Sequence, residues 1–82
     1  MYKTYVVKET LRHHEAPENA KVIAYPLATL QEAYDKLYDL YRVNFQFENL
    51  DFEYELLEKV WNSDTDELED INMLERKNVM SE

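Results

Sequence analysis

The chain has 82 residues, with no cysteine, no glycine and a formal net charge of −9 at pH 7. Without cysteine there are no disulfides and no thiolate metal ligands, and without glycine a phosphate-binding loop of the P-loop, Rossmann or kinase type is not expected. The length predicts a single small acidic domain over residues 1–82 with a marginal core and a frayed tail at about residues 78–82.

The first predicted element is a β-hairpin. Residues 2–8 are β-branched and aromatic, which predicts a strand. Residues 9–20 are rich in His, Glu and Asn and predict a polar loop. Residues 21–25 predict a second strand that stops at Pro26, because proline has no N–H to donate to a neighbouring strand. The simplest pairing is an antiparallel hairpin with a long loop.

A central amphipathic helix is predicted over about residues 30–42. Thr29 and Glu32 form a capping box, in which each side chain satisfies a free amide at the helix start. Beyond them, apolar and polar side chains separate onto two faces at helical spacing. The apolar face consists of Leu30, Ala33, Tyr34, Leu37, Leu40 and Tyr41. We expect this face to pack against the hairpin.

Residues 43–48 leave two structures open. Val43, Phe45 and Phe47 alternate with polar residues, which allows a short third strand. An extended linker is equally compatible with this pattern.

A second helix is predicted from about Asp51 to Trp61. Its main apolar stripe, at spacings typical of a helix, consists of Leu50, Tyr54, Leu57 and Trp61. Phe52 and Leu56 lie off this stripe, so they would need another helix, a subunit or a partner to cover them.

A third helix is predicted over residues 66–77, after a turn at residues 63–66. Acids come first and bases last, as the helix dipole favours, and the apolar stripe of Leu68, Ile71 and Leu74 is thin. The predicted fold class is therefore α+β. An N-terminal antiparallel hairpin, possibly with a short third strand, packs against the central helix and is followed by one or two acidic helices.

Few residues suggest catalysis or metal binding. His13, His14 and Glu15 form the only histidine cluster, and no cysteine or further histidine completes a metal site. Asp64 and Asp66 lack the glycine and the ligand spacing of a calcium loop. We therefore predict no catalytic residues, no metal and no cofactor. A small enzyme or metal protein that uses the histidine cluster is the weakest of the alternatives.

The negative charge is concentrated in one segment. Ten acids and one base lie between Glu48 and Asp70, so this segment alone carries the −9 of the whole chain. Such a surface repels nucleic acid and attracts basic proteins. On a helix, carboxylates three or four residues apart have Cβ atoms about 5–6 Å apart, a spacing comparable with that of DNA phosphates. The predicted electrostatic surface consists of Glu48, Asp51, Glu55, Glu58, Asp64, Asp66, Glu67 and Asp70.

Apolar side chains within the acidic segment are predicted to anchor a specific partner, which DNA phosphates alone would not do. The candidate anchors are Phe52, Leu56 and Trp61. Trp61 is also a candidate for the core.

In size, in its lack of cysteine and in its clustered acids and aromatics at residues 48–70, the chain resembles the small acidic phage-encoded proteins that mimic DNA. These include inhibitors of uracil-DNA glycosylase, restriction enzymes, CRISPR nucleases and the nucleoid protein HU. They do not share one fold, and the chain carries no family motif. The neutral N-terminal half departs from such mimics, which are often acidic over most of their surface.

The resemblance implies a non-catalytic inhibitor, encoded by a phage or mobile element. It would block the DNA-binding site of a basic host protein, such as HU, a restriction or CRISPR nuclease, or a transcription component. It would not bind nucleic acid itself.

Two other interpretations are left open. An immunity, antitoxin-type or adaptor protein would bind its partner through the apolar helix face of Phe52 and Leu56, with little dependence on salt. An ordinary acidic domain would simply expose a solvated acidic face. A homodimer is compatible both with the DNA-mimic inhibitor and with the protein that binds through an apolar helix face, because a two-fold axis would double the acidic surface.

No stretch approaches the ~20 apolar residues of a membrane span, and the first residues lack the apolar run of a signal peptide. We therefore expect no membrane association. The expected location is the cytoplasm, which would be that of the host cell for a phage-encoded protein.

Overall fold

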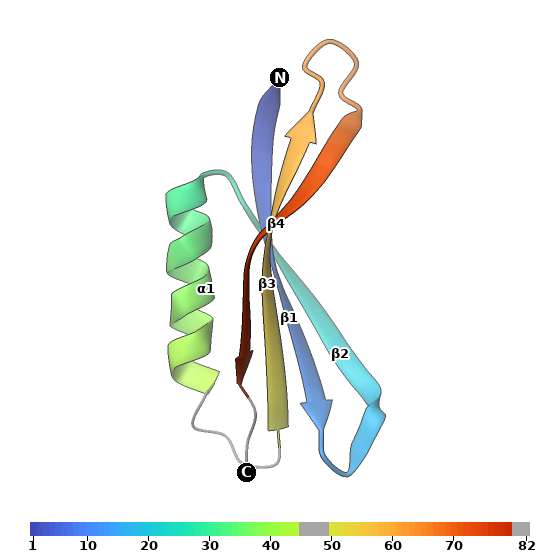
Figure 1. Ribbon diagram of the computed structural model, residues 1–82, viewed down its shortest axis with the longest axis vertical. Coiled ribbons are helices and arrows are strands. Elements are labelled where there is room, and N and C mark those ends of the chain that lie inside the picture. Colours follow the sequence, from blue (N-terminus) through green and yellow to red (C-terminus); the bar gives the residue numbers. More distant parts are fainter. Residues whose placement is uncertain (45–49, 80–82) are drawn as a thin grey trace.

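Four antiparallel strands of 12 residues each form one sheet, and a single helix packs on one of its faces (Figure 1). The computed structural model describes residues 1–44 and 50–79. The elements in chain order are β1 (Tyr2–His13), β2 (Ala16–Leu27), α1 (Leu30–Asn44), β3 (Leu50–Trp61) and β4 (Leu68–Val79). The strand order in the sheet is β2-β1-β3-β4, so β1 and β3 are central and β2 and β4 form the edges.

The core lies between α1 and one face of the sheet, which we call the α1 face. Successive side chains of a strand point to opposite faces, and residues opposite each other in neighbouring strands share a face. Val7 of β1 lies opposite Leu56 of β3, and both are fully buried. The buried apolar core consists of Tyr5, Val7, Ala33, Leu37, Phe52, Tyr54 and Leu56.

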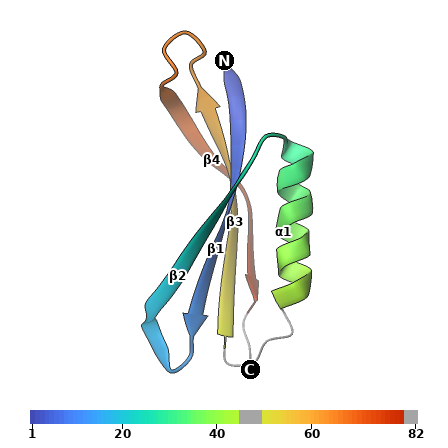
Figure 2. The same ribbon diagram turned by 180° about the vertical axis from the view of Figure 1, so that it is seen from behind.

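No helix covers the opposite face of the sheet within the described residues, and we call it the open face (Figures 1 and 2). Val6 and Lys8 of β1 and Glu55 and Leu57 of β3 belong to it, and each is half-buried. On the open face, these side chains are therefore only partly covered, and the cover comes from neighbouring side chains of the sheet.

The start of α1 is capped in the way its sequence predicts, with one shift. The Thr29 Oγ1 accepts a hydrogen bond from the Glu32 N–H at 3.1 Å. The Glu32 carboxylate accepts from the N–H of Ala28 at 3.4 Å, rather than from that of Thr29. Near the other end of α1, the hydroxyl of Tyr54 donates to the Leu40 carbonyl oxygen at 3.4 Å and ties the helix to β3.

One end of the sheet extends beyond both α1 and β2 (Figures 1 and 2). Strand β2 pairs with β1 only between Tyr5 and His13, so the first residues of β1 have β3 as their single neighbour. We call this extension the arm; it consists of residues 1–4 and 59–71, which include the turn between β3 and β4. The molecule is accordingly long and thin, with extents of 48 × 25 × 14 Å.

The predicted fold is wrong in its C-terminal half, because the two acidic helices predicted at residues 51–61 and 66–77 are the strands β3 and β4. In β3 the apolar residues Leu50, Phe52, Tyr54 and Leu56 alternate with acids, which is the two-residue period of a strand. The same segment also satisfies a helical spacing. The strand is formed because β1 and α1 bury the alternating set in one core.

The helical appearance of the β4 sequence comes from two irregularities in its pairing with β3. Leu74 is an extra residue between the pairs Leu56–Glu75 and Leu57–Met73, and Glu69 is another between Asp70 and Leu68. Each extra residue lengthens the local spacing of side chains on one face from two to three. Glu69 thus gives the spacing of three between Leu68 and Ile71, and Leu74, three residues further on, is itself an extra residue, so the segment resembles a helix although it is a strand.

The remaining boundaries also differ from those predicted from sequence. Most of the predicted loop at residues 9–20 is strand, because β1 continues to His13 and β2 begins at Ala16. Val43 and Asn44 belong to α1, and the rest of the possible third strand at residues 43–48 lies outside the described residues. Asn78 and Val79, assigned to a frayed tail, belong to β4, whereas residues 80–82 lie outside the described part of the chain.

A pair of neighbouring leucines distinguishes the strand from the helix that the sequence predicted. Leu56→Ala should lower the free energy of unfolding by about 2–5 kcal/mol, because Leu56 is fully buried on the α1 face. Leu57→Ala should cost roughly half of that or less, because Leu57 is half-buried on the open face. Urea denaturation of both variants measures the difference. In the helical alternative Leu57 lies on the buried stripe, so a larger cost for Leu57→Ala would contradict the strand.

Candidate functional site

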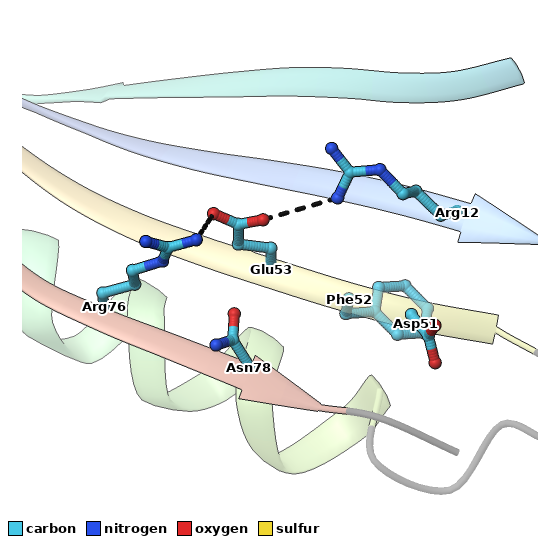
Figure 3. Close-up of a pocket in the computed structure, with 6 residues that line it drawn as sticks. All are labelled: Arg12, Asp51, Phe52, Glu53, Arg76 and Asn78. Carbon is cyan, nitrogen blue, oxygen red and sulfur yellow. Dashed lines mark hydrogen bonds and ion pairs between the residues drawn. The ribbon is translucent and has the colours of Figure 1, made fainter. Parts of the chain in front are cut away.

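Several acids of β3 are neutralised by bases on neighbouring strands. Glu53 lies on the open face between Arg12 and Arg76 (Figure 3). Its carboxylate oxygens accept from the Arg12 Nη1 at 3.4 Å and from the Arg76 Nη2 at 2.6 Å. The Asp51 Oδ1 lies 2.8 Å from the Nε2 of His14. These acids are therefore poorly placed to present free negative charge to a partner.

The predicted electrostatic row is not continuous in the structure. Asp51 and Glu55 lie on the open face, where Glu55 is opposite Lys8 of β1. Glu58 lies on the α1 face, and its carboxylate is 3.7 Å from the Lys3 Nζ. The two-residue period of a strand thus separates acids that a helix would have placed together. Glu48 lies outside the described residues.

Two of the three predicted apolar anchors lie in the core. Phe52 is 6% exposed and Leu56 is 0% exposed, so neither side chain contacts a partner in this fold. Their assignment as surface anchors is corrected, because α1 covers the face on which they lie. Trp61 is half-buried in the arm, where its Nε1 donates to the Thr4 Oγ1 at 2.7 Å.

The turn between β3 and β4 gathers the other predicted acids at one end of the molecule. We call residues 62–70 the acidic turn. Its five carboxylates are all exposed, and none of them forms an ion pair within the described residues. They belong to Asp64, Asp66, Glu67, Glu69 and Asp70. Four of the eight predicted electrostatic residues are therefore brought together here, and Glu69 joins them.

Hydrogen bonds around Asn62 give the acidic turn a defined backbone. The Asn62 side-chain oxygen accepts from the N–H of Asp64 at 2.8 Å and of Thr65 at 3.4 Å, the pattern of an Asx turn. The Asp66 N–H donates to the Asn62 carbonyl oxygen at 2.7 Å, and the Asn62 N–H donates to the Glu67 carbonyl oxygen at 2.9 Å. The carboxylates are therefore carried on an ordered loop.

Asp66 adopts a left-handed backbone conformation, with φ of 57°. Its Oδ1 accepts a hydrogen bond from the hydroxyl of Tyr2 at 3.1 Å. Burial raises the pKa of Tyr2 above 10.0, and the hydrogen bond and the negative charge of Asp66 raise it further. Tyr2 is therefore a neutral donor at physiological pH that holds the turn against the start of β1.

Apolar side chains that the sequence reasoning did not assign lie beside the acidic turn. On the open face of the arm, Trp61 lies between Tyr2 and Leu68, and the rings of Tyr2 and Trp61 stack with centroids 6.2 Å apart. Leu68 is 41% exposed, and Ile71 is 49% exposed. The shared face of Trp61 and Leu68 follows from the register of β3 with β4, and no local period indicates it because a turn separates the two in sequence.

A shallow pocket of about 270 Å³ occupies the opposite end of the open face (Figure 3). It is lined by Arg12, Asp51, Phe52, Glu53, Arg76 and Asn78. Both guanidinium groups point toward Glu53, which neutralises part of their charge. The pocket therefore offers little net charge to a small ligand.

The predicted histidine cluster lies at the turn between β1 and β2, where His14 contacts Asp51. Among the described residues, no group of three or more His, Cys, Asp or Glu side chains is arranged to hold a metal ion. In the same part of the chain, no helix is long and apolar enough to cross a membrane.

Comparison of the chain with protein-family models, with curated protein sequences and with solved structures finds no match.

The backbone of Asp66 generates a first prediction for this site. Asp66→Gly should change the free energy of unfolding by less than about 1 kcal/mol, because relief of strain at the left-handed position offsets the loss of the hydrogen bond from Tyr2. Asp66→Val should lower it by about 1–2 kcal/mol, because a β-branched residue disfavours this conformation. Chemical denaturation of the two variants tests the turn, and equal losses for both would contradict the observed geometry.

The pairing of Tyr2 with Asp66 generates a second prediction. In spectrophotometric titrations, the absorbance difference between wild type and Tyr2→Phe reports the ionisation of Tyr2, and its midpoint should lie above pH 10.0. Asp66→Asn should lower that midpoint. A raised pKa favours the neutral tyrosine in the folded state. The corresponding stability is thus present below pH 10.0 and is lost as the pH rises through the raised pKa. A midpoint at or below 10.0 would contradict the contact.

Proposed function

We propose that the protein is a non-catalytic inhibitor that presents the acidic turn to the nucleic-acid-binding surface of a basic protein and so excludes nucleic acid from it. The observation that carries the proposal is the group of five exposed carboxylates within residues 64–70, none of them ion-paired within the described residues. The excess negative charge of the chain is thus directed toward one end.

The electrostatics of the arm favour a basic partner. A group of five negative charges on the turn and the first residues of β4 attracts a positively charged groove over a distance of about 8–10 Å at physiological salt. The ordered backbone of the turn lowers the entropic cost of binding, because the carboxylates are already positioned. Binding that depends on these charges is expected to weaken as salt rises.

The apolar side chains beside the turn provide a source of specificity. Exposed Leu68 and Ile71 and the half-buried Trp61 lie on the open face of the arm, next to the acids. Such residues can enter an apolar pocket of one protein, which DNA phosphates cannot do. In this proposal they replace Phe52 and Leu56 as anchors.

The proposed protein is still a DNA-mimic inhibitor, but the surface that mimics DNA is smaller than the sequence predicted. The mimicked feature is a short group of phosphates represented by residues 64–70, rather than a row extending from residue 48 to residue 70. A target among nucleoid proteins, restriction or CRISPR nucleases or the transcription machinery, an origin in a phage or mobile element, and a cytoplasmic location belong to the same proposal.

A second candidate function rests on the arm and on the adjoining residues of β4. The exposed apolar side chains of Leu68, Ile71 and Met73 favour an adaptor or immunity-type protein whose partner binds mainly through apolar contacts. Such binding would be nearly insensitive to salt and to neutralisation of the acids.

Replacing three carboxylates of the acidic turn by neutral amides tests the proposal. Asp64→Asn/Asp66→Asn/Glu67→Gln should reduce capture of a basic DNA-binding protein from nuclease-treated bacterial lysate by about tenfold or more, because three of the exposed charges are removed. Wild-type protein should release the captured partner on addition of duplex DNA, or between about 0.2 and 0.5 M salt. Quantitative mass spectrometry of the eluates measures both effects.

The matched control is Glu15→Gln/Glu18→Gln/Asp35→Asn, which removes the same charge from exposed positions outside the arm. This control should capture as much partner as wild type. Equal loss in both variants would indicate non-specific attraction by net charge, and equal retention in both would favour the apolar alternative. Either result would overturn the proposal.

A further inference from the structure

The two edges of the sheet differ in how well they resist pairing with another strand. Edge strands present unpaired N–H and C=O groups, which act as a template for a further strand. Strand β2 contains Pro17 and Pro26, which have no N–H to donate. Strand β4 contains no proline over its 12 residues. The β4 edge is therefore the one that can accept a strand.

The middle of β4 carries exposed apolar side chains. Ile71 is 49% exposed, Met73 is 53% exposed and Leu74 is 37% exposed. Leu74 is the extra residue in the pairing with β3. An exposed, apolar edge of this length is characteristic of a strand that pairs in an assembly.

The order of charges along β4 is complementary to itself in the antiparallel direction. Asp70 lies near the start of the strand, and Arg76 and Lys77 lie near its end. When two copies of β4 run antiparallel, the acidic start of each lies beside the basic end of the other. A two-fold axis then produces every such contact twice.

The faces of the sheet restrict the register of such a pair. The register with β3 places Asp70, Asn72, Glu75 and Lys77 on the α1 face and Ile71, Met73 and Arg76 on the open face. Residues opposite each other in an antiparallel pair must share a face. One register that satisfies this rule sets Asp70 opposite Lys77, Ile71 opposite Arg76 and Asn72 opposite Glu75 of the second copy.

We propose that β4 pairs antiparallel with β4 of a second copy in this register, forming a homodimer with one continuous sheet. At the two-fold axis, Met73 of each copy lies beside Leu74 of the other, so two exposed apolar side chains of each copy are covered. On the α1 face, Asp70 of each copy pairs with Lys77 of the other. Lys77 is 35% exposed, and its Nζ lies 3.7 Å from the Glu75 Oε1 of its own chain, so the pair with Asp70 of the second copy brings a second acid to this amine.

Neighbouring registers lack these ion pairs. A slip of two residues in one direction sets Asp70 opposite Glu75 of the second copy, which places like charges together. A slip of two residues in the other direction sets Asp70 opposite Val79 and forms no acid–base pair. The faces alone also allow the register with Asp70 opposite Val79, so the charges select between these two registers.

This inference does not rest on the proposed function, because dimerisation is measured with the purified protein alone. Sedimentation velocity and light scattering over a range of concentrations should give twice the chain mass for wild type. Asp70→Lys and Lys77→Glu should each weaken the dimer about tenfold or more, because each replaces two attractive contacts with two repulsive ones. The double variant Asp70→Lys/Lys77→Glu should restore dimerisation, because the charges are exchanged.

Glu18→Lys is the control, because it makes the same change in net charge as Asp70→Lys on the other edge strand. It should dimerise like wild type, and circular dichroism should show that all variants are folded. A wild-type monomer at every concentration, or a double variant as weak as the single ones, would overturn the proposal. Failure of the wild-type dimer to capture a basic DNA-binding protein would instead contradict only the proposed function.

Discussion

The pairing of β3 with β1 on one side and β4 on the other is the constraint on which the rest of the structure depends. This pairing imposes a two-residue period on the most acidic segment of the chain. One set of side chains, including Phe52, Tyr54 and Leu56, is buried under α1. The other set, including Asp51, Glu53 and Glu55, lies on the open face among bases of the neighbouring strands.

The same pairing determines where free negative charge is found. Glu53 lies between two arginines and Asp51 contacts His14, so the acids within the sheet are largely compensated. In the turn that follows β3, the chain leaves the sheet and has no neighbouring strand to supply bases. Asp64, Asp66 and Glu67 remain exposed for this reason, and Glu69 and Asp70 follow as exposed residues at the start of the edge strand β4. The distribution of charge is thus a consequence of topology as well as of composition.

The arm combines the features that the functional proposals use. It lies beyond α1 and β2 (Figure 1), and its apolar side chains Leu68 and Ile71 are exposed. A sheet generally needs another layer or further strands to be stable. Pairing of β4 with a second copy supplies further strands. Because the pairing is antiparallel, it leaves the two acidic turns at opposite ends of the dimer, where their repulsion is smallest.

Local sequence signals were sufficient for the presence of an N-terminal hairpin, for α1 and for its Thr29 cap, but not for the length of the hairpin strands, which include most of the predicted loop at residues 9–20. They were insufficient for β3 and β4. Glu, Leu and Lys favour helices, and the spacings from Leu50 to Trp61 satisfy a helical stripe as well as a strand. Phe52 and Leu56, which a single helical stripe leaves uncovered, were the residues that pointed to the alternating period.

The sequence by itself determined the net charge, its concentration in one segment, the position of the helix and the presence of a first hairpin, since these depend on composition and on short-range spacing. The tertiary structure alone decided that the acidic segment is a strand, which of its acids are paired and which are free, and that Phe52 and Leu56 are buried. Those outcomes depend on contacts such as Arg12 with Glu53 and Val7 with Leu56, which join residues distant in the chain. Strand register sets these contacts, and no local pattern specifies it.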